Sequence, residues 1–115
     1  MAPKEHDELN GLATRLNAVG EPTRLRIVTL LTGGPMTVGQ IAEELGVVLV
    51  NVSHHLGILR NAGLLLPEKE GRYVRYALSP DVCQSAGGSW VIDLGGCRLE
   101  IPKSAANSKP VRKPR

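Results

Sequence analysis

The chain has 115 residues, of which 42% are hydrophobic, and it carries a formal net charge of +3 with no Phe and one Trp. This length suits one small domain with an aliphatic core. It excludes a membrane protein, because no apolar run approaches the roughly 20 residues of a membrane-spanning helix. Two cysteines are too few for a disulfide framework and no secretory signal precedes them, so we expect a cytoplasmic location and no contact with a membrane.

The positive charge is concentrated at the C-terminal end. Residues 103–115 hold five of the fourteen Lys and Arg residues and no acid, so residues 1–102 carry nine basic side chains against eleven acidic ones. The sequence pI of about 9.1 therefore comes from this segment. We expect residues 103–115 to form a disordered basic tail that either attracts phosphate non-specifically or only improves solubility.

The first 35 residues predict two helices. The first carries an apolar stripe at helical spacing, formed by Leu9, Leu12, Ala13, Leu16 and Val19. Gly20 ends this pattern, and Pro22 suits the first turn of a second helix. We expect the second helix to end at residues 33–35 and to bury Leu25, Val28 and Leu31.

Residues 37–63 predict two short helices joined by a tight turn. Thr37 and Gln40 have the spacing of a capping box, so the first helix begins there. Gly46 ends it, because glycine readily takes the positive φ of a helix C-terminus. The second helix ends at residues 62–63 and has an inward apolar stripe formed by Leu49, Val52, Leu56 and Leu59. This pattern is typical of a helix-turn-helix, although a helical hairpin that only fills a core is the alternative.

Residues 64–78 then predict a β-hairpin. An apolar run is followed by a polar turn with Gly71 and by an alternating run from Tyr73 to Leu78 that is rich in aromatic and β-branched residues. A helix-turn-helix followed directly by such a hairpin is a winged helix.

Through these residues the chain resembles the ArsR/SmtB family of bacterial repressors. The motifs that carry the resemblance lie within residues 9–80, at 21–27, 37–45, 52–56, 59–64 and 71–76. The resemblance implies a winged helix-turn-helix protein that binds a palindromic operator in double-stranded DNA as a homodimer. It also implies that Ser53, His54 and the wing arginine face the DNA.

The second helix of the pair is expected to read DNA bases. When its apolar stripe faces inward, His54 lies on the opposite face with Asn51 beside it, a face that suits the major groove. Asn51 can pair with adenine, His54 can donate to guanine or phosphate, and Val50 can contact a thymine methyl group. The neighbouring His55 is expected to be structural. The candidate DNA-binding residues are Thr37, Gln40, Val50, Asn51, Ser53, His54, Arg60, Arg72 and Arg75.

Residues 79–102 depart from the family, whose members usually have a long helix after the wing. Here residues 79–81 predict a short helical turn that Gly87-Gly88 soon interrupts. Residues 90–101 predict a second β-hairpin about Gly95-Gly96. One of its faces is wholly apolar and consists of Trp90, Ile92, Leu94, Cys97, Leu99 and Ile101. We expect this face to pack on the first helix, at Leu9, Leu12 and Leu16, and to contribute to the dimer interface.

The predicted fold class is therefore α+β. Residues 1–80 form a winged helix-turn-helix DNA-binding domain, residues 81–102 add the helical turn and the C-terminal β-hairpin on the same domain, and residues 103–115 are the tail.

The metal sites of the family have no counterpart here. Thr37 and Gly39 stand where relatives have a cysteine pair, and Asp81 is the only ligand type near the second family site. We expect no metal ion and no cofactor. Cys83 and Cys97 are candidate thiol sensors, but they are also compatible with small apolar packing residues or with a zinc site shared by two chains.

The leading hypothesis is a sequence-specific DNA-binding transcriptional regulator, dimeric and acting as a repressor, with an effector that the sequence does not identify. The alternative is a winged helix that binds proteins without specific DNA binding. No motif indicates an enzyme.

Overall fold

The computed structural model describes the backbone of residues 3–104 and the side chains of residues 8–104. This part of the chain has four α-helices and six strands, and the strands form two three-stranded sheets. The fold is α+β, as predicted. No helix in residues 3–104 is long and apolar enough to cross a membrane. The predicted tail lies outside the described residues except for residues 103 and 104.

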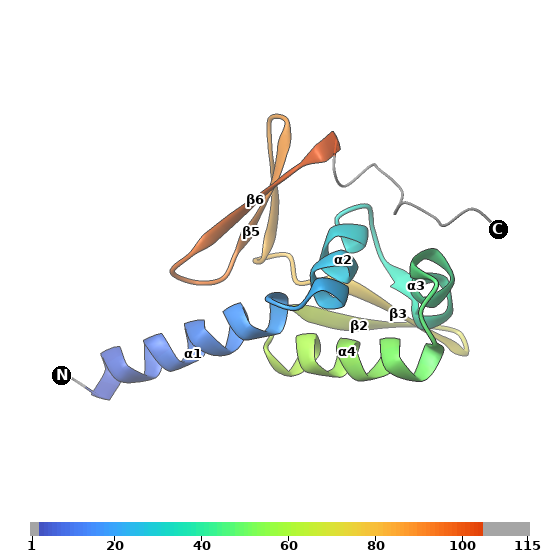
Figure 1. Cartoon of the computed structure of the whole chain (residues 1–115), viewed down its shortest axis with the longest axis horizontal. Coiled ribbons are helices and arrows are strands. Elements are labelled where there is room, and N and C mark those ends of the chain that lie inside the picture. The colour runs from blue at the N-terminus through green and yellow to red at the C-terminus, as the bar shows by residue number, and fades with distance from the viewer. Residues whose placement is uncertain (1–2, 105–115) are drawn as a thin grey trace.

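The four helices form the N-terminal part of the molecule (Figure 1). They are α1 (Pro3–Val19), α2 (Pro22–Leu31), α3 (Val38–Leu45) and α4 (Leu49–Asn61). Their fully buried side chains form one aliphatic cluster that includes Ile27, Val28, Ile41, Val52, Leu56 and Leu59. At about 25 cal/mol per Å² of apolar surface, burial of this cluster is the main stabilising contribution to the fold.

The predicted boundaries of α3 are confirmed at both ends. The Gln40 backbone N–H donates to Thr37 Oγ1 at 3.1 Å, and the Thr37 N–H donates to Gln40 Oε1 at 2.9 Å. Gly46 has a φ of 66°, and the Val47 N–H donates to the Ala42 carbonyl. This cap turns the chain sharply. Helix α4 begins at Leu49, three residues after Gly46, and packs against α3.

Four residues that were predicted to be buried in the helices are exposed instead. Leu25 is 41% exposed because α2 turns the neighbouring Ile27 and Val28 inward. Leu49 is 54% exposed because it precedes the part of α4 that lies over the core. In α1, Leu9 and Leu16 are exposed, so the stripe is buried only near the C-terminal end of the helix.

The predicted wing is confirmed, with one additional strand. Strands β2 (Leu65–Glu70) and β3 (Tyr73–Leu78) form the hairpin, with Gly71 at a φ of 62° in the turn. The short strand β1 (Met36–Thr37) pairs with the other edge of β3 and gives the order β1-β3-β2. Because β1 leads directly into α3, this pairing fixes the wing to the helix-turn-helix.

The second sheet replaces the short helical turn that the sequence predicted. It consists of β4 (Cys83–Ala86), β5 (Ser89–Asp93) and β6 (Arg98–Pro102), in the order β4-β5-β6. The Ser-Pro-Asp segment that suits a helix start also suits a β-turn, and the Val82 N–H donates to the Ser79 carbonyl at 2.8 Å, the i to i+3 bond of a turn. The helix prediction was therefore wrong.

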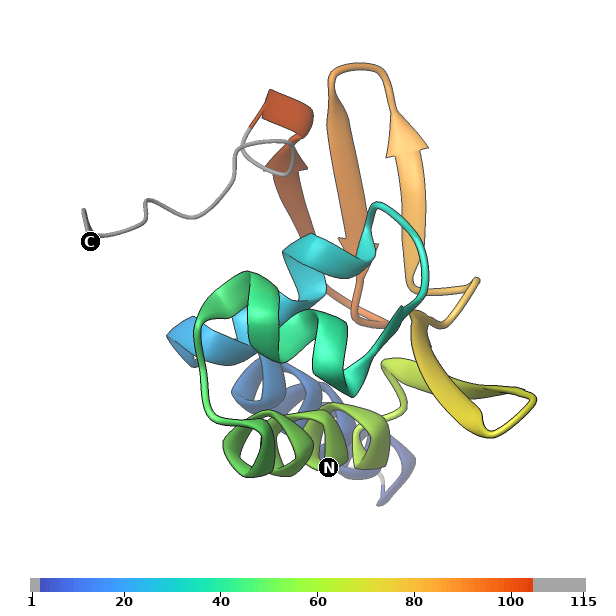
Figure 2. The same cartoon turned by 90° about the vertical axis from the view of Figure 1, so that its right-hand side faces the viewer.

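The predicted hairpin register of β5 and β6 is confirmed. Asp93 lies opposite Arg98, Ile92 opposite Leu99, and Trp90 opposite Ile101. Ile92 and Leu94 are completely buried and belong to the same cluster as the helices. The sheet stands beside α2, on the side of the molecule opposite α4 (Figures 1 and 2).

The hairpin meets the first helix differently from the prediction. The β5–β6 turn contacts α1: Arg15 Nε donates to the Leu94 carbonyl at 2.5 Å, and Gly96 approaches the Leu12 side chain. Leu9 and Leu16 remain exposed beyond this contact. The reason is geometric: the β5–β6 turn lies nearest to α1, and the strands run away from this helix (Figure 1).

Lys103 directly follows β6 and is held against the second sheet. Its backbone N–H donates to the Gly88 carbonyl at 2.9 Å, and its Nζ donates to Ser85 Oγ at 2.6 Å. The same Nζ lies 4.7 Å from the centre of the Trp90 ring, within cation–π range. Strand β6 ends at Pro102, so these contacts continue one residue beyond the sheet, into the segment that the sequence predicted to be a disordered tail.

Candidate nucleic-acid interface

The outer face of α4 carries the polar residues that the sequence singled out. Asn51, Ser53 and His54 are exposed, while Val52 is completely buried among the other inward residues. On a helix of 3.6 residues per turn, His54 lies nearly opposite the buried side, and Val50 lies one turn before it on the same face. The structure thus brings Val50, Asn51, Ser53 and His54 together on the first two turns of α4.

The turn of the wing is placed at the same end of the molecule as the start of α4. Figure 1 shows both at one end, and Figure 2 shows the wing to one side of α4 when that end is viewed directly. Arg72 is exposed in this turn, next to Gly71. In a helix-turn-helix the N-terminal part of the second helix contacts base edges, so a wing arginine at this end can reach the adjacent phosphates.

The second wing arginine is engaged within the protein. Arg75 Nη1 donates to Glu70 Oε1 at 2.8 Å, and its Nη2 lies 3.5 Å from the Pro35 carbonyl. The Glu70 carboxylate, which would otherwise repel phosphate, is therefore paired with a cation. Arg75 contributes to the potential of the wing, but its guanidinium is less free than that of Arg72.

Three further candidates occupy different places. Thr37 and Gln40 bind one another's backbone in the capping box, so their side chains are already engaged at the start of α3. Arg60 is exposed in the last turn of α4. It lies six residues beyond His54, about 9 Å along the axis, and so stands apart from the cluster at the beginning of the helix.

A side-chain network that sequence reasoning missed holds α4 in position. Arg24 of α2 donates from Nε to the Ala18 carbonyl at 2.6 Å, and its Nη1 lies 3.2 Å from His55 Nδ1. Because a guanidinium can only donate, Nδ1 must accept, which places the proton of a neutral His55 on Nε2. Glu21 Oε1 lies 4.0 Å from the same ring nitrogen. His55 is thus structural, as predicted, but its partners are side chains and not the backbone.

Glu21 connects this network to the start of α2. Its carboxylate accepts the Arg24 backbone N–H at 2.8 Å as the N-cap of the helix. That hydrogen bond lowers the pKa of Glu21, and the positive charge of Arg24 also lowers it, although desolvation acts in the opposite direction. The sequence signal that could have revealed the cap was an acid immediately before Pro22 at a helix start.

Gly57 also lies on the outer side of α4, beside the exposed polar residues. It lies in the interior of α4, seven residues after Val50, and a Cβ built on it would meet no atom within 4 Å. Glycine is unfavourable inside a helix, and no packing contact of the protein requires it here.

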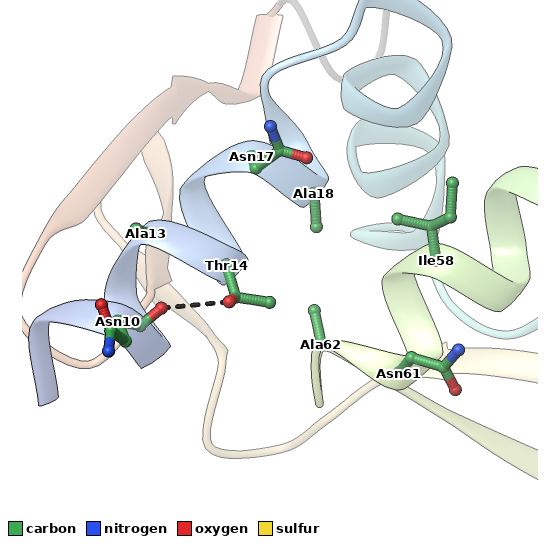
Figure 3. Close-up of a pocket in the computed structure, with 8 residues that line it drawn as sticks. All are labelled: Asn10, Ala13, Thr14, Asn17, Ala18, Ile58, Asn61 and Ala62. Carbon is green, nitrogen blue, oxygen red and sulfur yellow. Dashed lines mark hydrogen bonds between the residues drawn. The ribbon is translucent and has the colours of Figure 1, made fainter. Parts of the chain in front are cut away.

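A groove lies between α1 and the C-terminal half of α4 (Figure 3). Its volume is about 610 Å³, and it is lined by Asn10, Ala13, Thr14, Asn17, Ala18, Ile58, Asn61 and Ala62. The lining has amides, one hydroxyl and small apolar side chains but no charged group. Its chemistry suits a polypeptide surface or an uncharged molecule better than phosphate.

The two cysteines lie too far apart to bond to each other within one chain. Cys83 of β4 pairs with Ile92 on one side of β5. The Cys97 carbonyl accepts from the backbone N–H of Leu94, directly after β5, on the opposite side, where β6 pairs with β5. Two strand spacings amount to about 9–10 Å, beyond the roughly 7 Å that a disulfide spans between Cα atoms. Burial also raises the pKa of the Cys83 thiol, which lowers its reactivity.

No cluster of three or more His, Cys, Asp or Glu side chains that could hold a metal ion occurs in the described part of the chain. The geometry instead defines a winged helix-turn-helix, with an exposed polar face on the second helix and an arginine at the turn of the wing. That is the architecture of a DNA-binding transcriptional regulator.

Comparison with known proteins identifies the family. The profile described as "Bacterial regulatory protein, arsR family" matches residues 21–65. The transcriptional repressor SdpR of Bacillus subtilis is 39% identical over 77 residues, which cover 67% of this chain and 84% of SdpR. The regulator CmtR of Mycobacterium tuberculosis is 43% identical over 82 residues, covering 71% of this chain and 70% of CmtR.

A solved structure supports the same assignment. The homodimeric winged helix-turn-helix DNA-binding domain of a possible ArsR-family regulator from Mycobacterium bovis superposes with a TM-score of 0.67 at 27% identity, covering 70% of this chain and 75% of that domain. The chain belongs to the arsR family of bacterial regulatory proteins, as its resemblance to ArsR/SmtB repressors predicted.

Proposed function

We propose that this protein is a homodimeric repressor that binds a palindromic operator with α4 in the major groove and Arg72 on the adjacent phosphates. The observation that carries the proposal is the exposed group of Asn51, Ser53 and His54 at the start of α4, with the completely buried Val52 among them. The relatives named as repressors and the homodimeric structural relative support it. A cytoplasmic location and a regulatory role without catalysis accompany this proposal, because its target is DNA.

Dimerisation is proposed to use α1. Leu9 is 58% exposed and Leu16 is 38% exposed, although both lie on the apolar stripe of an amphipathic helix. The groove between α1 and α4 adjoins this surface. A partner that covers α1 would thus also adjoin the helix that reads DNA. In this arrangement residues 1–80 bind DNA, and residues 81–102 form a structural sheet on the opposite side.

The experiment selects duplexes from a random pool and then measures binding of single variants to the enriched sequence. Asn51→Ala and His54→Ala should each weaken specific binding by about 1–3 kcal/mol and relax the base preference. The control Gln84→Ala, on the exposed edge of the second sheet, should bind like wild type. Equal affinity of all three variants for the enriched duplex would contradict the proposed docking.

The phosphate contact is tested separately through salt dependence. Arg72→Ala should weaken binding to every duplex and reduce the slope of log K against log salt by about 1. Arg98→Ala provides a matched control, because Arg98 is an exposed arginine on the distant second sheet. If the two arginine variants have the same slope, the wing does not contact the DNA backbone as proposed.

A further inference from the structure

Large apolar side chains are exposed at the beginning of α4. Val48 is 65% exposed, Leu49 54% and Val50 69%. Soluble proteins expose single apolar residues routinely, but a consecutive exposed group on one surface indicates a contact. The core of the protein does not use these three side chains, whereas Val52, two residues after Val50, is completely buried.

Val50 belongs to the polar face of α4 and not to the side that packs on the core. Residues four apart on a helix are neighbours on its surface, so Val50 adjoins His54, and Asn51 follows it directly. Each of these side chains is exposed. The apolar group is therefore continuous with the face proposed to enter the major groove.

The major groove has one apolar feature that a valine can recognise. Base pairs present hydrogen-bond donors and acceptors there, and thymine alone among the four bases adds a methyl group at C5. A valine pressed against the polar edges alone would desolvate them without returning a hydrogen bond, at a cost in free energy. Contact with a methyl group instead removes apolar surface of both partners from water.

On these grounds we propose that Val50 reads the C5 methyl group of a thymine in each operator half-site, with Leu49 completing the apolar contact. The inference rests on the proposed function, since it names the chemistry that α4 recognises within the operator. It makes Val50 a specificity-determining residue that complements the hydrogen-bonding Asn51 and His54.

The test replaces thymine by deoxyuridine, which keeps every hydrogen-bonding group and lacks only the methyl. Thymines of the enriched operator are replaced one position at a time, symmetrically in both half-sites, and the affinity of the wild-type protein is measured for each duplex. One or two positions should weaken binding about three- to fivefold for each methyl group removed. The remaining positions should change little.

Val50→Ala identifies the side chain responsible. Alanine favours the helix more than valine does, and Val50 is largely exposed, so the variant should fold normally. It should bind the thymine duplex more weakly than wild type does, and it should bind the thymine and deoxyuridine duplexes equally. Val91→Ala, on the second sheet away from α4, is the matched control and should keep the full dependence on the methyl group.

The outcomes separate this inference from the proposed function. If the wild-type protein binds its enriched operator tightly but no deoxyuridine substitution weakens binding, the inference is wrong while the proposed function stands. If Val50→Ala retains the full dependence on the methyl group, another side chain reads it and the inference is again wrong. If no duplex is enriched, the proposed function fails and the inference fails with it.

Discussion

Replacement of Gly57 by alanine should stabilise the protein and weaken its binding to DNA. Gly57 lies in the interior of the thirteen-residue helix α4, and a Cβ added there would meet no atom within 4 Å. The new methyl group therefore costs no steric strain in the folded protein. The full difference in helix propensity between glycine and alanine, about 1 kcal/mol, should appear as increased stability.

The effect on DNA binding has the opposite sign because of where the residue lies. Gly57 is seven residues after Val50 and three after His54, so it follows them along the outer side of α4. Glycine at an unpacked helical position permits close approach of another molecule's backbone. A methyl group at this position should therefore hold the DNA away from the helix and reduce affinity for all sequences.

Thermal unfolding and DNA titration of the same preparation measure the two effects. For a domain of this size, 1 kcal/mol corresponds to an increase in Tm of about 4–8 °C. Gly11→Ala is the matched control: it is also a glycine inside a helix, and its new methyl meets only the flexible end of Arg15 at 3.4 Å. It should raise the Tm without changing DNA affinity. A Gly57→Ala protein that is more stable and binds DNA as well as wild type would refute the proposed close approach.

Three further predictions concern the wing, the second sheet and the start of α2. Arg75→Ala should weaken DNA binding at low salt, because it leaves the negative charge of Glu70 without its partner. The free energy of unfolding should change by less than about 1 kcal/mol, as is usual for an exposed ion pair. Unchanged binding in gel-shift titrations would contradict this prediction. Ile92→Ala should lower the free energy of unfolding by about 2–5 kcal/mol, because the Ile92 side chain is completely buried. Trp90→Ala should lower it by less, because the Trp90 ring is partly exposed beside Lys103. Urea denaturation measures both changes, and the reverse order would refute this prediction. Glu21→Gln should be less stable than wild type at neutral pH. Because the pKa of Glu21 is lowered in the folded protein, its carboxylate stabilises the fold fully above the ordinary pKa of 4.5 and loses this effect as pH falls through the lowered value. The stabilities of wild type and Glu21→Gln should therefore become equal in acid. A difference that persists at low pH would contradict the role of Glu21 as a charged cap.

The sequence determined those parts of the fold that depend on local signals. The capping box at Thr37 and Gln40 and the positive φ of Gly46 need only neighbouring residues, so both were predicted and both are present. The register of β5 and β6 followed from a two-residue glycine turn and from alternation along each strand, because a slip by one residue would place every apolar side chain on the wrong face. The face of α4 that carries Asn51 and His54 followed from helical periodicity in the same way.

Tertiary structure alone decided the rest. Strands β1 and β4 are too short to show a period, and they are strands because β3 and β5 offer them a hydrogen-bonding edge. Leu9 and Leu16 match the apolar stripe of α1 but stay exposed, because periodicity predicts a face without stating what covers it. The Arg24–His55 contact joins residues 31 positions apart, and its geometry depends on where α2 and α4 pack. No local pattern encodes such a contact, because the distance between two helices is set by the side chains of the whole core between them.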